Sequence, residues 1–460
     1  MHNLSDTSRT LIFCGLTLLF FVAQRFWLIR ANRVIERMGS PRWRRWCRAL
    51  LVAVLAFIIF SFTDRLIFRV VYFRLHILSW TMAFSQLWLF FSSLAFLAVK
   101  AVHVLEWIWN QLPRVRVPVL AATASAGQLT PQQEQCLLPV PAASGATAPA
   151  NAAVALTGLN DPPIDRQRRK LFQYMASLAA CVPFGAGIYG FASERLSYTV
   201  QRVDLPVANL PPALDGLRIV QMSDIHIGDF MPPSEIRRAV AMANELRADL
   251  AVLTGDYLTA SRDPLPECIA ELGRLRAPLG VWGCNGNHEI YAGVEDEVET
   301  LFHRHGMRLL RQDSVRLQWR GANFNLIGVD HQSDFARFGG RRAMLVESEH
   351  LVRRDMPNIL LSHNPNSFPR AAELGIEAVL SGHTHGGQIR IEIVDRSLSP
   401  ARFITDFIAG HYQLPLPSGG RPELAGKNSS LYVNRGIGTI GIPARVGAKP
   451  EITLHTLRPA

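Results

Sequence analysis

Long apolar runs fill much of the first 200 residues, whereas residues 201–460 alternate short apolar stretches with polar ones. Residues 78–99 contain no charged side chain and exceed the roughly 20 residues that a helix needs to cross a bilayer. We predict a transmembrane helix there, and further spans at the apolar runs 11–29 and 49–62. Residues 171–191, rich in Ala and Gly and preceded by four basic residues, are a candidate fourth span or membrane anchor, with a buried helix as the alternative.

The arginines indicate how these spans are oriented. The segment from Arg30 to Arg48 carries seven arginines and is therefore expected on the cytoplasmic side. Alternation then places the N-terminus outside, residues 112–170 inside and the C-terminal part of the chain on the extracytoplasmic side. Arg168, Arg169 and Lys170 also resemble the core of a twin-arginine export signal, which favours the same side. Three arginines in the loop after the second predicted span argue against this orientation.

Changes in composition divide the rest of the chain. Ala, Pro, Gly, Ser, Thr and Gln dominate residues 117–163, so we predict a flexible linker at 112–170, after a transmembrane region at 1–111. From residue 200 to residue 460, short apolar runs alternate with amphipathic patterns, which predicts a layered α/β domain of two packed sheets with helices outside. The predicted strands are 217–222, 250–253, 279–282, 324–327, 359–361 and 378–380. The predicted helices are 233–247, 265–274, 294–305 and 342–353.

Charge argues against a nucleic acid as the main substrate. The net charge of +11 lies wholly in the first 200 residues, which hold 20 basic and 8 acidic residues, whereas residues 201–460 hold 28 and 29. A groove that binds a polymer of phosphates would need its basic residues in the α/β part, so a nuclease is disfavoured. The six cysteines form no CxxC pair and predict no disulfide framework, although a pairing of Cys268 with Cys284 stays open.

Potential metal ligands follow most of the predicted strands. They lie in five short blocks: Asp224-Ile225-His226, Gly255-Asp256, Gly286-Asn287-His288-Glu289, Ser362-His363-Asn364 and Gly382-His383-Thr384-His385. Groups at the carboxyl ends of parallel strands meet at one edge of a sheet, which is where α/β enzymes place their chemistry. Carboxylate, amide and imidazole groups in this number could hold two metal ions that share a bridging ligand.

Most of these blocks, taken singly, have a structural alternative. An acid two residues from a histidine is common on surfaces, the Asn-His pair fits a simple turn, and Asp256 fits a helix N-cap. A lone histidine such as His363 is more often a core residue than a ligand. The most specific block is the pair His383 and His385, because two histidines between glycines have little structural purpose.

Taken together and in this order, the blocks resemble the calcineurin-like metallophosphoesterase family over about residues 217–456. The segments 362–365, 382–388 and 434–439 are similar to those of its membrane-associated bacterial branch, which includes phosphodiesterases and UDP-2,3-diacylglucosamine hydrolases. The resemblance implies a four-layer α/β/β/α sandwich at residues 200–460. It also implies a multi-pass protein of a bacterial inner membrane.

The same resemblance implies a role for each ligand. The first metal ion would be bound by Asp224, His226, Asp256 and His385. The second would be bound by Asp256, Asn287, His363 and His383. A hydroxide shared by the two divalent ions would attack the phosphorus atom, and Mn, Zn and Fe all suit this mixture of ligands.

The blocks also contain residues that the resemblance assigns to neither ion. His288 would stand at the mouth of the site and donate a hydrogen bond or proton to the leaving oxygen. Glu289 could orient His288 or be an exposed acid, and Arg435 could contact a substrate phosphate or lie on the surface. Asp330 and His331 could line the pocket, but we do not expect either to bind metal.

We therefore predict a membrane-anchored dinuclear phosphoesterase that hydrolyses a phosphodiester or a pyrophosphate. The membrane anchor indicates a lipid-linked or nucleotide-sugar substrate, and the family branch includes hydrolases of UDP-2,3-diacylglucosamine. An extracytoplasmic catalytic domain would argue against that cytoplasmic lipid-A precursor, so the orientation decides between these substrates. The expected partners are a phosphorylated small molecule or lipid and the membrane, with no nucleic acid. Two alternatives stay open: a phosphomonoesterase of the same fold, and a membrane receptor or transport module whose metallo-domain is a degenerate sensor. The complete ligand set argues against the sensor.

Overall fold

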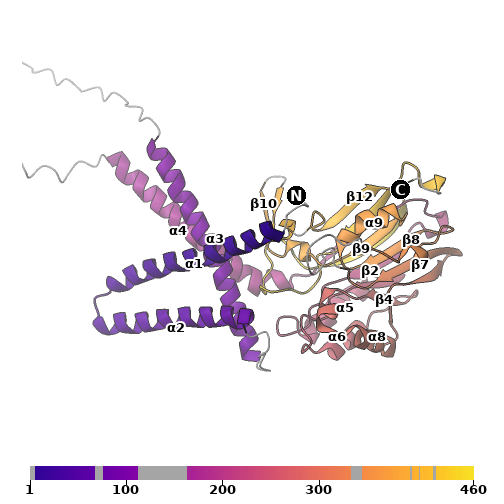
Figure 1. Ribbon diagram of the computed structural model, residues 1–460, viewed down its shortest axis with the longest axis horizontal. Coiled ribbons are helices and arrows are strands. Elements are labelled where there is room, and N and C mark those ends of the chain that lie inside the picture. Colours follow the sequence, from indigo (N-terminus) through magenta and orange to yellow (C-terminus); the bar gives the residue numbers. More distant parts are fainter. Residues whose placement is uncertain are drawn as a thin grey trace, which may run out of the picture. The chain divides into compact units, whose positions relative to one another are not determined.

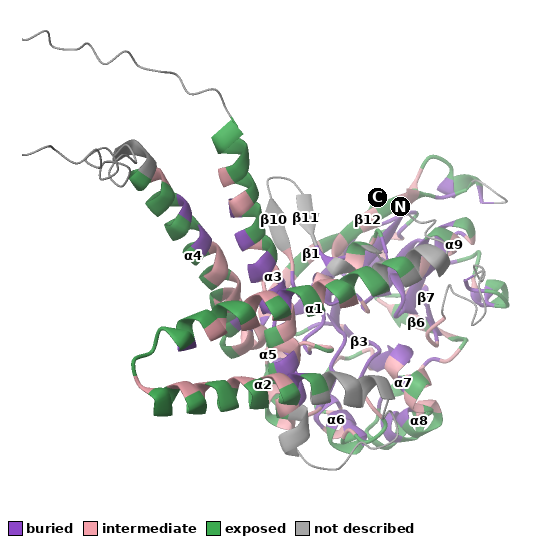
Figure 2. Ribbon diagram, turned by 60° about the vertical axis from the view of Figure 1, so that its left-hand side comes forward, coloured by how far each residue is buried: buried purple, intermediate pink, exposed green. Residues whose placement is uncertain are grey.

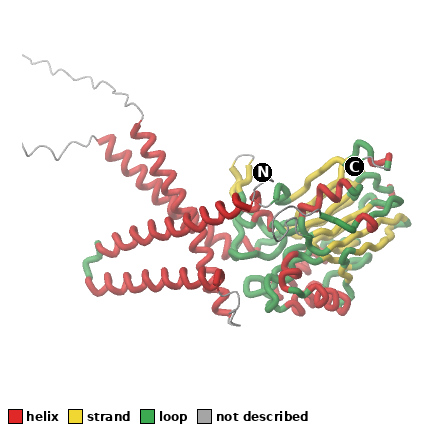
Figure 3. The backbone as a smooth tube through the Cα atoms, viewed as in Figure 1, coloured by secondary structure: helices red, strands yellow, loops and turns green. Residues whose placement is uncertain are grey.

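The computed structural model describes residues 6–67, 76–111, 163–332, 344–393, 396–403, 405–417 and 421–460. Long helices occupy the first part of the chain, and strands with short helices occupy the last part (Figures 1 and 3). Two compact units are distinguished, Met1–Leu94 with Val182–Ala460, and Ala95–Cys181. The predicted linker at 112–170 lies outside the described residues up to residue 162, so it stays a prediction there.

Four long helices precede the strands: α1 (Asp6–Glu36), α2 (Pro41–Ile67), α3 (His76–Gln111) and α4 (Pro163–Ala192). Three stretches, at Cys14–Glu36, Trp80–Gln111 and Arg166–Leu196, are long and apolar enough to cross a membrane. Large apolar side chains such as Phe21 in α1 and Leu178 in α4 are exposed, as membrane lipid would require (Figure 2). Among the described helices, α2 is not such a candidate. Four arginines lie in its first eight residues. The second span, predicted at 49–62 within α2, therefore has no support from this criterion and stays a prediction.

The first sheet carries the ligand blocks that come earliest in the chain. Its strand order is β1-β14-β2-β3-β4-β5, and β2 to β5 run parallel to one another. The strands are β1 (Thr199–Val207), β14 (Glu451–Pro459), β2 (Arg218–Met222), β3 (Leu250–Thr254), β4 (Val281–Cys284) and β5 (Arg308–Leu309). The strand β14 lies antiparallel to β2 and parallel to β1, so the first and last strands of the domain pair at one edge of the sheet.

The second sheet carries the later blocks. Its order is β12-β13-β9-β8-β7-β6, with β13, β9, β8 and β7 parallel and the two edge strands antiparallel to their neighbours. The strands are β12 (Gly410–Pro415), β13 (Asn428–Val433), β9 (Ala378–Ser381), β8 (Asn358–Ser362), β7 (Ala322–Val329) and β6 (Asp313–Trp319). A separate hairpin joins β10 (Ile391–Ile393) to β11 (Arg396–Leu398).

Five short helices flank or connect the strands: α5 (Pro233–Glu245), α6 (Leu265–Leu272), α7 (Asn287–Ala292), α8 (Glu295–Arg304) and α9 (Phe368–Glu373). The 3-10 turns are η2 (Glu194–Leu196), η3 (Pro212–Leu214), η4 (Glu349–Leu351), η5 (Pro365–Ser367), η6 (His385–Gly387), η7 (Pro400–Phe403) and η8 (Pro422–Leu424). Proline opens α5, and buried residues three or four apart, such as Ile236, Ala239 and Val240, form its inner face.

Three apolar clusters account for the layering. Ile219 of β2 and Leu361 of β8 belong to one cluster, which lies between the two sheets. The next residue on β2, Val220, faces the helices α5 and α6 instead, and Leu360 of β8 packs with Phe368 of α9. Figure 1 shows α5, α6 and α8 on one side of the strands and α9 on the other. Both sheets are therefore buried on both faces, and the predicted four-layer α/β/β/α sandwich is confirmed.

The predicted strands and three of the four predicted helices are present within a few residues. The helix predicted at 342–353 is wrong in its described part, since only the turn η4 forms there. Leu345 and Glu347 have φ angles of 53° and 65°, which interrupt helical hydrogen bonding; residues 342 and 343 lie outside the described residues. The edge strands β1, β6 and β12 were not expected from the sequence, because their polar and partly exposed residues give no continuous apolar run.

Candidate metal centre

Five strand ends deliver the predicted ligands. Asp224 and His226 follow β2, Asp256 follows β3, and Asn287 follows β4 in the first sheet. In the second sheet, His363 directly follows β8, and the pair His383 and His385 follows β9. These strands are parallel within each sheet, so their carboxyl ends lie at one edge of the sandwich. All seven predicted metal ligands meet there.

The backbone at these residues is unusual. Five of the seven predicted ligands have φ angles in the left-handed region, listed here as Asp224 (50°), His226 (50°), Asp256 (56°), His383 (77°) and His385 (52°). Side chains other than glycine rarely adopt this conformation, which costs about 1–3 kcal/mol per residue. Backbone strain gathered on ligand residues indicates that the fold maintains these side-chain directions for a purpose other than stability.

Glycines allow the loops that carry the predicted ligands to approach one another closely. A Cβ atom on Gly286 would collide with the carboxylate of Asp256, and one on Gly436 would collide with the side chain of Asp224. Gly436 also has a φ angle of 68°, where any other residue would be strained. The glycines around the ligands therefore provide both the turns and the space behind the carboxylates.

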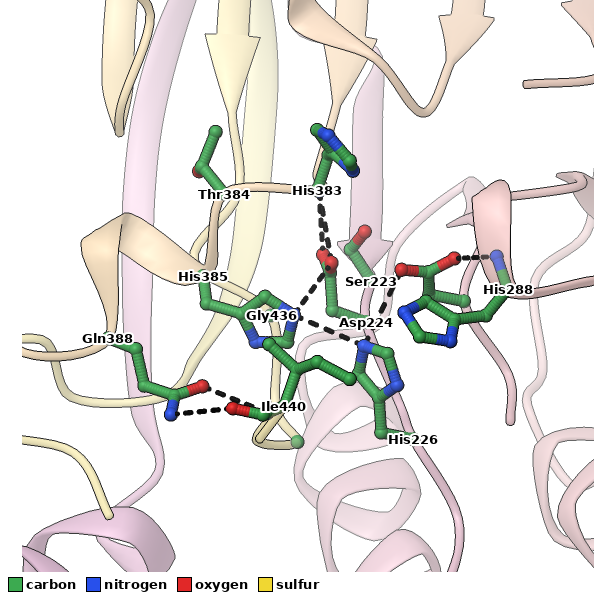
Figure 4. A network of polar contacts seen from close by, with 12 residues as sticks. Ser223, Asp224, His226, His288, His383, Thr384, His385, Gln388, Gly436 and Ile440 are labelled. Atoms are coloured by element: carbon green, nitrogen blue, oxygen red, sulfur yellow. Dashed lines mark hydrogen bonds and ion pairs between the residues drawn. The ribbon is translucent and has the colours of Figure 1, made fainter. Parts of the chain in front are cut away.

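Four side chains form what we call the inner group: Asp224, His226, Asp256 and His385. Figure 4 shows Asp224, His226 and His385 turned toward one another. The Nε2 atoms of His226 and His385 are 3.1 Å apart, and Nε2 of His385 lies 3.3 Å from an oxygen of Asp224. Nε2 of His226 lies 3.5 Å from Asp256. All four residues are buried, so the inner group is closed to solvent.

Three further residues form the outer group: Asn287, His363 and His383. Nδ1 of His383 lies 2.8 Å from the amide oxygen of Asn287 and 3.3 Å from Nε2 of His363. Nε2 of His363 lies 3.1 Å from Oδ2 of Asp256, the same oxygen that faces His226. Asp256 therefore stands between the two groups, as a bridging carboxylate would. His383 is partly exposed, so the outer group borders the solvent.

The charges around these groups favour a cation. Burial lowers the pKa of His226 to about 3 and holds that of His385 well below its ordinary value, so two neutral imidazoles face each other. Burial alone would raise the pKa of Asp256, but the neighbouring His363 holds it well below the usual range. The lone pairs of two imidazoles and two carboxylates therefore converge, and few N–H or O–H groups lie between them. Metal ions of the kind that bind nitrogen and oxygen ligands fit this donor set.

The remaining nitrogen atoms of the ligand histidines are fixed by neighbours. Nδ1 of His363 donates to the carbonyl of Thr254 at 2.6 Å, and Nδ1 of His226 lies 3.0 Å from the hydroxyl of Thr259. The carbonyl of Thr254 can only accept, so it holds a proton on Nδ1 of His363 and directs Nε2 of that ring into the site. Such contacts are typical of imidazoles that bind metal.

His288 lies at the rim, where the sequence predicted it. Its ring is partly exposed and edge-on to His226, with 4.8 Å between ring centroids. Nδ1 of His288 donates to the carbonyl of Thr259 at 2.8 Å, and its backbone N–H donates to Oδ1 of Asp256 at 3.0 Å. The ring is therefore held with Nε2 available to a substrate.

Glu289 has a role that the sequence did not reveal. It is neither exposed nor in contact with the His288 ring, but fully buried. Its carboxylate accepts from the backbone N–H groups of Asp256 at 2.9 Å, Tyr257 at 2.7 Å and Gly286 at 2.7 Å. Burial raises the pKa of Glu289 to about 7. Glu289 thus joins the turn that carries Asn287 to the loop that carries Asp256.

Two arginines lie behind the inner group. Arg435 pairs with buried Glu451, with Nε 3.1 Å from the carboxylate, so its charge is already partnered. Arg445, which no motif in the sequence indicates, is fully buried. Its guanidinium donates to the carbonyls of His385 at 3.3 Å and Ala448 at 3.0 Å, and to three carbonyls of the loop 435–438. Only the tertiary structure identifies Arg445, because an arginine in a polar loop is usually exposed.

An apolar cavity adjoins the ligands. It has a volume of about 360 Å³. Its walls in the α/β domain are His383, Thr384, His385, Gly387, Gln388, Ile389, Ala401, Thr405, Ile440, Gly441 and Ile442. The side chain of Gln388 is tied to the far wall, since it accepts from the N–H of Ile440 at 2.9 Å and donates to that residue's carbonyl at 3.0 Å (Figure 4).

Known proteins are similar to this chain over its α/β part. Residues 217–387 match the family described as calcineurin-like phosphoesterase. A bovine (Bos taurus) protein named "Transmembrane protein with metallophosphoesterase domain" is 31% identical over 294 residues, which cover 62% of this chain and 62% of the relative. The chain thus spans about three fifths of that relative.

Bacterial relatives match over a similar stretch. The "Uncharacterized metallophosphoesterase YkuE" of Bacillus subtilis is 27% identical over 305 residues, which cover 63% of this chain and 97% of the relative. The "UDP-2,3-diacylglucosamine pyrophosphatase LpxG" of Chlamydia trachomatis is 26% identical over 275 residues, which cover 50% of this chain and 81% of the relative.

Proposed function

Residues 217–387 belong to the calcineurin-like phosphoesterase family, and from this premise we propose that the protein is a membrane-anchored hydrolase that uses two divalent metal ions to cleave a phosphodiester or pyrophosphate bond. The observation that carries the proposal is the convergence of seven ligands into two groups that share Asp256, five of them on a strained backbone. A degenerate sensor would have no need to maintain that strain.

The ligands divide the work of binding. The inner group would hold one ion, the outer group a second, and Asp256 would join both. Two divalent ions supply Lewis acidity, which activates water near neutral pH and stabilises charge on the phosphoryl oxygens. Mn, Zn and Fe suit the mixed ligands. With Nδ1 bonded to Thr259, His288 can donate from Nε2 to the departing oxygen in its imidazolium form.

The apolar cavity supports a lipid-linked substrate. It opens beside His383 and His385, and its other walls include Ile389, Ile440 and Ile442. This wall is also joined to the candidate membrane span in α4. The backbone N–H of Arg445, three residues after Ile442, donates to the carbonyl of Gly190 near the end of α4 at 3.2 Å. An acyl chain bound in this cavity would bring its phosphoester to the ligands. UDP-2,3-diacylglucosamine, the substrate in the name of the Chlamydia relative, combines such chains with a pyrophosphate. It would suit this site only if the domain lay in the cytoplasm; on the extracytoplasmic side the substrate would be another lipid-linked phosphodiester or pyrophosphate.

The distribution of arginines supports an extracytoplasmic catalytic domain in a bacterial inner membrane. Seven arginines lie in 30–48 and four basic residues lie in 166–170. Both clusters are expected in the cytoplasm, so α4 would carry the domain to the opposite side. Maleimide labelling of a cysteine added after Ala460 tests this orientation in intact cells. Labelling by an impermeant reagent is expected, and labelling only after lysis would place the domain inside.

The decisive test of the activity uses the full chain in detergent, stripped of metal and titrated with Mn²⁺ or Zn²⁺. We expect hydrolysis of bis-p-nitrophenyl phosphate to return with metal and to exceed hydrolysis of p-nitrophenyl phosphate. Asp256→Asn removes the shared charge and should lower kcat/KM by about 10³-fold or more, because both ions lose a ligand. Asp313→Asn, at an exposed carboxylate, is the matched control and should keep full activity. Asp256→Asn with undiminished activity would refute the two-ion proposal.

A second test addresses the lipid. A diester that carries a dodecyl chain should be cleaved with a kcat/KM about 10-fold higher than its methyl analogue, because burial of methylene groups stabilises binding. Ile442→Glu should abolish this preference and leave hydrolysis of the methyl analogue unchanged. Val346→Glu, at an exposed apolar residue outside the cavity, should keep the preference. Equal rates for both diesters in the unmodified protein would remove the support for a lipid substrate.

A further inference from the structure

His331 lies beside the outer group, at the end of a third neighbouring strand. Val329 of β7 pairs with Ser362 of β8, so His331 is one strand away from His363. Its ring centroid is 5.9 Å from that of His363 and 5.4 Å from that of His383. Ligand atoms of these three histidines lie within 4.8 Å of one another. Three adjacent strands thus end in three imidazoles that converge.

The buried nitrogen of His331 has no assigned role. Its Nδ1 atom is buried and, among the described residues, has no hydrogen-bond partner. A buried polar atom without a partner is costly and uncommon in native proteins. The other imidazoles of the site differ, because Nδ1 of His363 is bonded to Thr254 and Nδ1 of His383 lies against Asn287. A ligand that the nitrogen of His331 could bind would account for the difference.

The residues on both sides of His331 are fixed to the ligand loops. The carboxylate of Asp330 accepts from Nδ2 of Asn285 at 2.8 Å and pairs with Arg311 at 3.0 Å. The carbonyl of Gln332 accepts from Nδ2 of Asn364 at 2.9 Å. Asn285 lies two residues before Asn287, and Asn364 directly follows His363. The position of His331 is therefore set by the same loops that position the outer group, as expected for a ligand.

His455 shows what a buried histidine with a purely structural role looks like. Its Nδ1 is also buried without a partner among the described residues. However, its Nε2 donates to the side chain of Gln221 at 2.9 Å, and its ring packs on Tyr432 with 4.7 Å between centroids. None of the candidate metal groups includes His455. The two histidines share an unpaired nitrogen, but only His331 faces other imidazoles.

We propose that His331 is a further protein ligand of the second metal ion, the ion of the outer group. This inference rests on the two-ion site proposed above. A third imidazole beside His363 and His383 would shift that site toward metals that favour nitrogen ligands, such as Zn or Fe, and away from Mg. From the sequence we expected His331 at most to line the pocket, because the imidazoles beside it come from other strands.

The test measures metal binding and is independent of activity. The full chain in detergent is stripped of metal and titrated with Co²⁺, followed by calorimetry and by visible absorption. The unmodified protein should take up two ions. His331→Gln should weaken the lower-affinity ion by about 10- to 100-fold and change its absorption, while the higher-affinity ion is unaffected. His455→Gln is the matched control and should leave both affinities unchanged. Unchanged affinities and absorption in His331→Gln would refute the inference and leave the two-ion site intact.

A second readout uses the unmodified protein, so it does not depend on the variant folding. Diethyl pyrocarbonate modifies accessible imidazoles, and mass spectrometry locates the product. His331 should be modified in the metal-free protein and protected when the second equivalent of Co²⁺ binds. Modification that is the same with one and two equivalents would refute the inference. Uptake of a single ion by the unmodified protein would instead refute the two-ion proposal, and the ligand role of His331 with it.

Discussion

The inner and outer groups each contain two histidines but differ in their other side chains and in their surroundings. The inner group is buried throughout, and its residues come mainly from loops of the first sheet. The outer group gathers at the ends of β4, β8 and β9 and includes the partly exposed His383. Burial favours tight and permanent binding, because water cannot replace a lost ligand. Partial exposure gives room for a substrate and for exchange of the ion.

On the proposed function, this difference would let one site both retain metal and turn over substrate. Asp256 lies between the groups, so an ion in the outer group would be positioned by one in the inner group, although His383 of the outer group is partly exposed. The apolar cavity lies beside His383 and His385, at the boundary between the groups. We therefore expect substitutions in the two groups to have unequal effects.

The largest expected difference is between His226→Ala and His383→Ala. His226 lies beside Asp256 in the closed group, so its loss should reduce kcat/KM by about 10³-fold and lower the content of both ions. At His383 water can enter, so the loss should be nearer about 10²-fold with one ion retained. Kinetics with bis-p-nitrophenyl phosphate and elemental analysis of the purified variants measure both effects. Equal losses of metal in the two variants would contradict the comparison.

Arg445→Met tests whether the inner group depends on the buried guanidinium that binds the backbone of His385 and of the loop 435–438. Burial lowers the pKa of Arg445 to about 10, so the guanidinium is still charged near neutral pH. Its removal leaves the carbonyls of His385 and of the loop 435–438 without their buried donor. We expect a loss of about 3 kcal/mol or more in unfolding free energy and weaker binding of the inner ion alone. Chemical denaturation measures the first effect and calorimetry the second.

A matched variant for this prediction is Arg458→Met. Arg458 makes exposed ion pairs with Asp204 and Asp215, far along β14 from the ligands. It should leave the unfolding midpoint nearly unchanged, because exposed pairs contribute little. A similar midpoint for both variants would show that Arg445 does not support the inner group.

The smallest expected effect is on the pH dependence of stability, and it concerns His455, a buried histidine that is not a predicted ligand. Burial lowers the pKa of His455 from 6.5 to about 3, so the unfolded chain binds a proton that the folded protein does not. Stability is therefore complete above pH 6.5 and is lost as the pH falls toward 3, by about 1.4 kcal/mol at pH 5.5. His455→Gln should remove this part of the pH dependence. Thermal unfolding of both proteins from pH 7.5 to 5.5 measures the difference, and parallel curves would contradict it.

The extent to which the sequence predicted this site differs between its parts. The seven predicted ligands could be proposed from the sequence, because each follows an apolar strand and glycines flank several of the blocks, and the structure brings them together. Glu289 was found in the right block but without its role, since hydrogen bonds to Asp256, Tyr257 and Gly286 depend on two loops meeting. Arg445 and the position of His331 could not be inferred, because their partners are remote in sequence.

Local patterns in the sequence predict the apolar helices, the buried strands β2, β3, β4, β7, β8 and β9, and the residue types available for chemistry. These properties are local, since period, charge and turn residues act over a few positions. The tertiary structure decided which side chains share a carboxylate, which histidine nitrogens are unpaired and where an apolar cavity borders the ligands. Such features arise when strands that are remote in sequence pack together, as those of Gln221 and Ser381 do at a separation of 160 residues, and no local pattern records that contact.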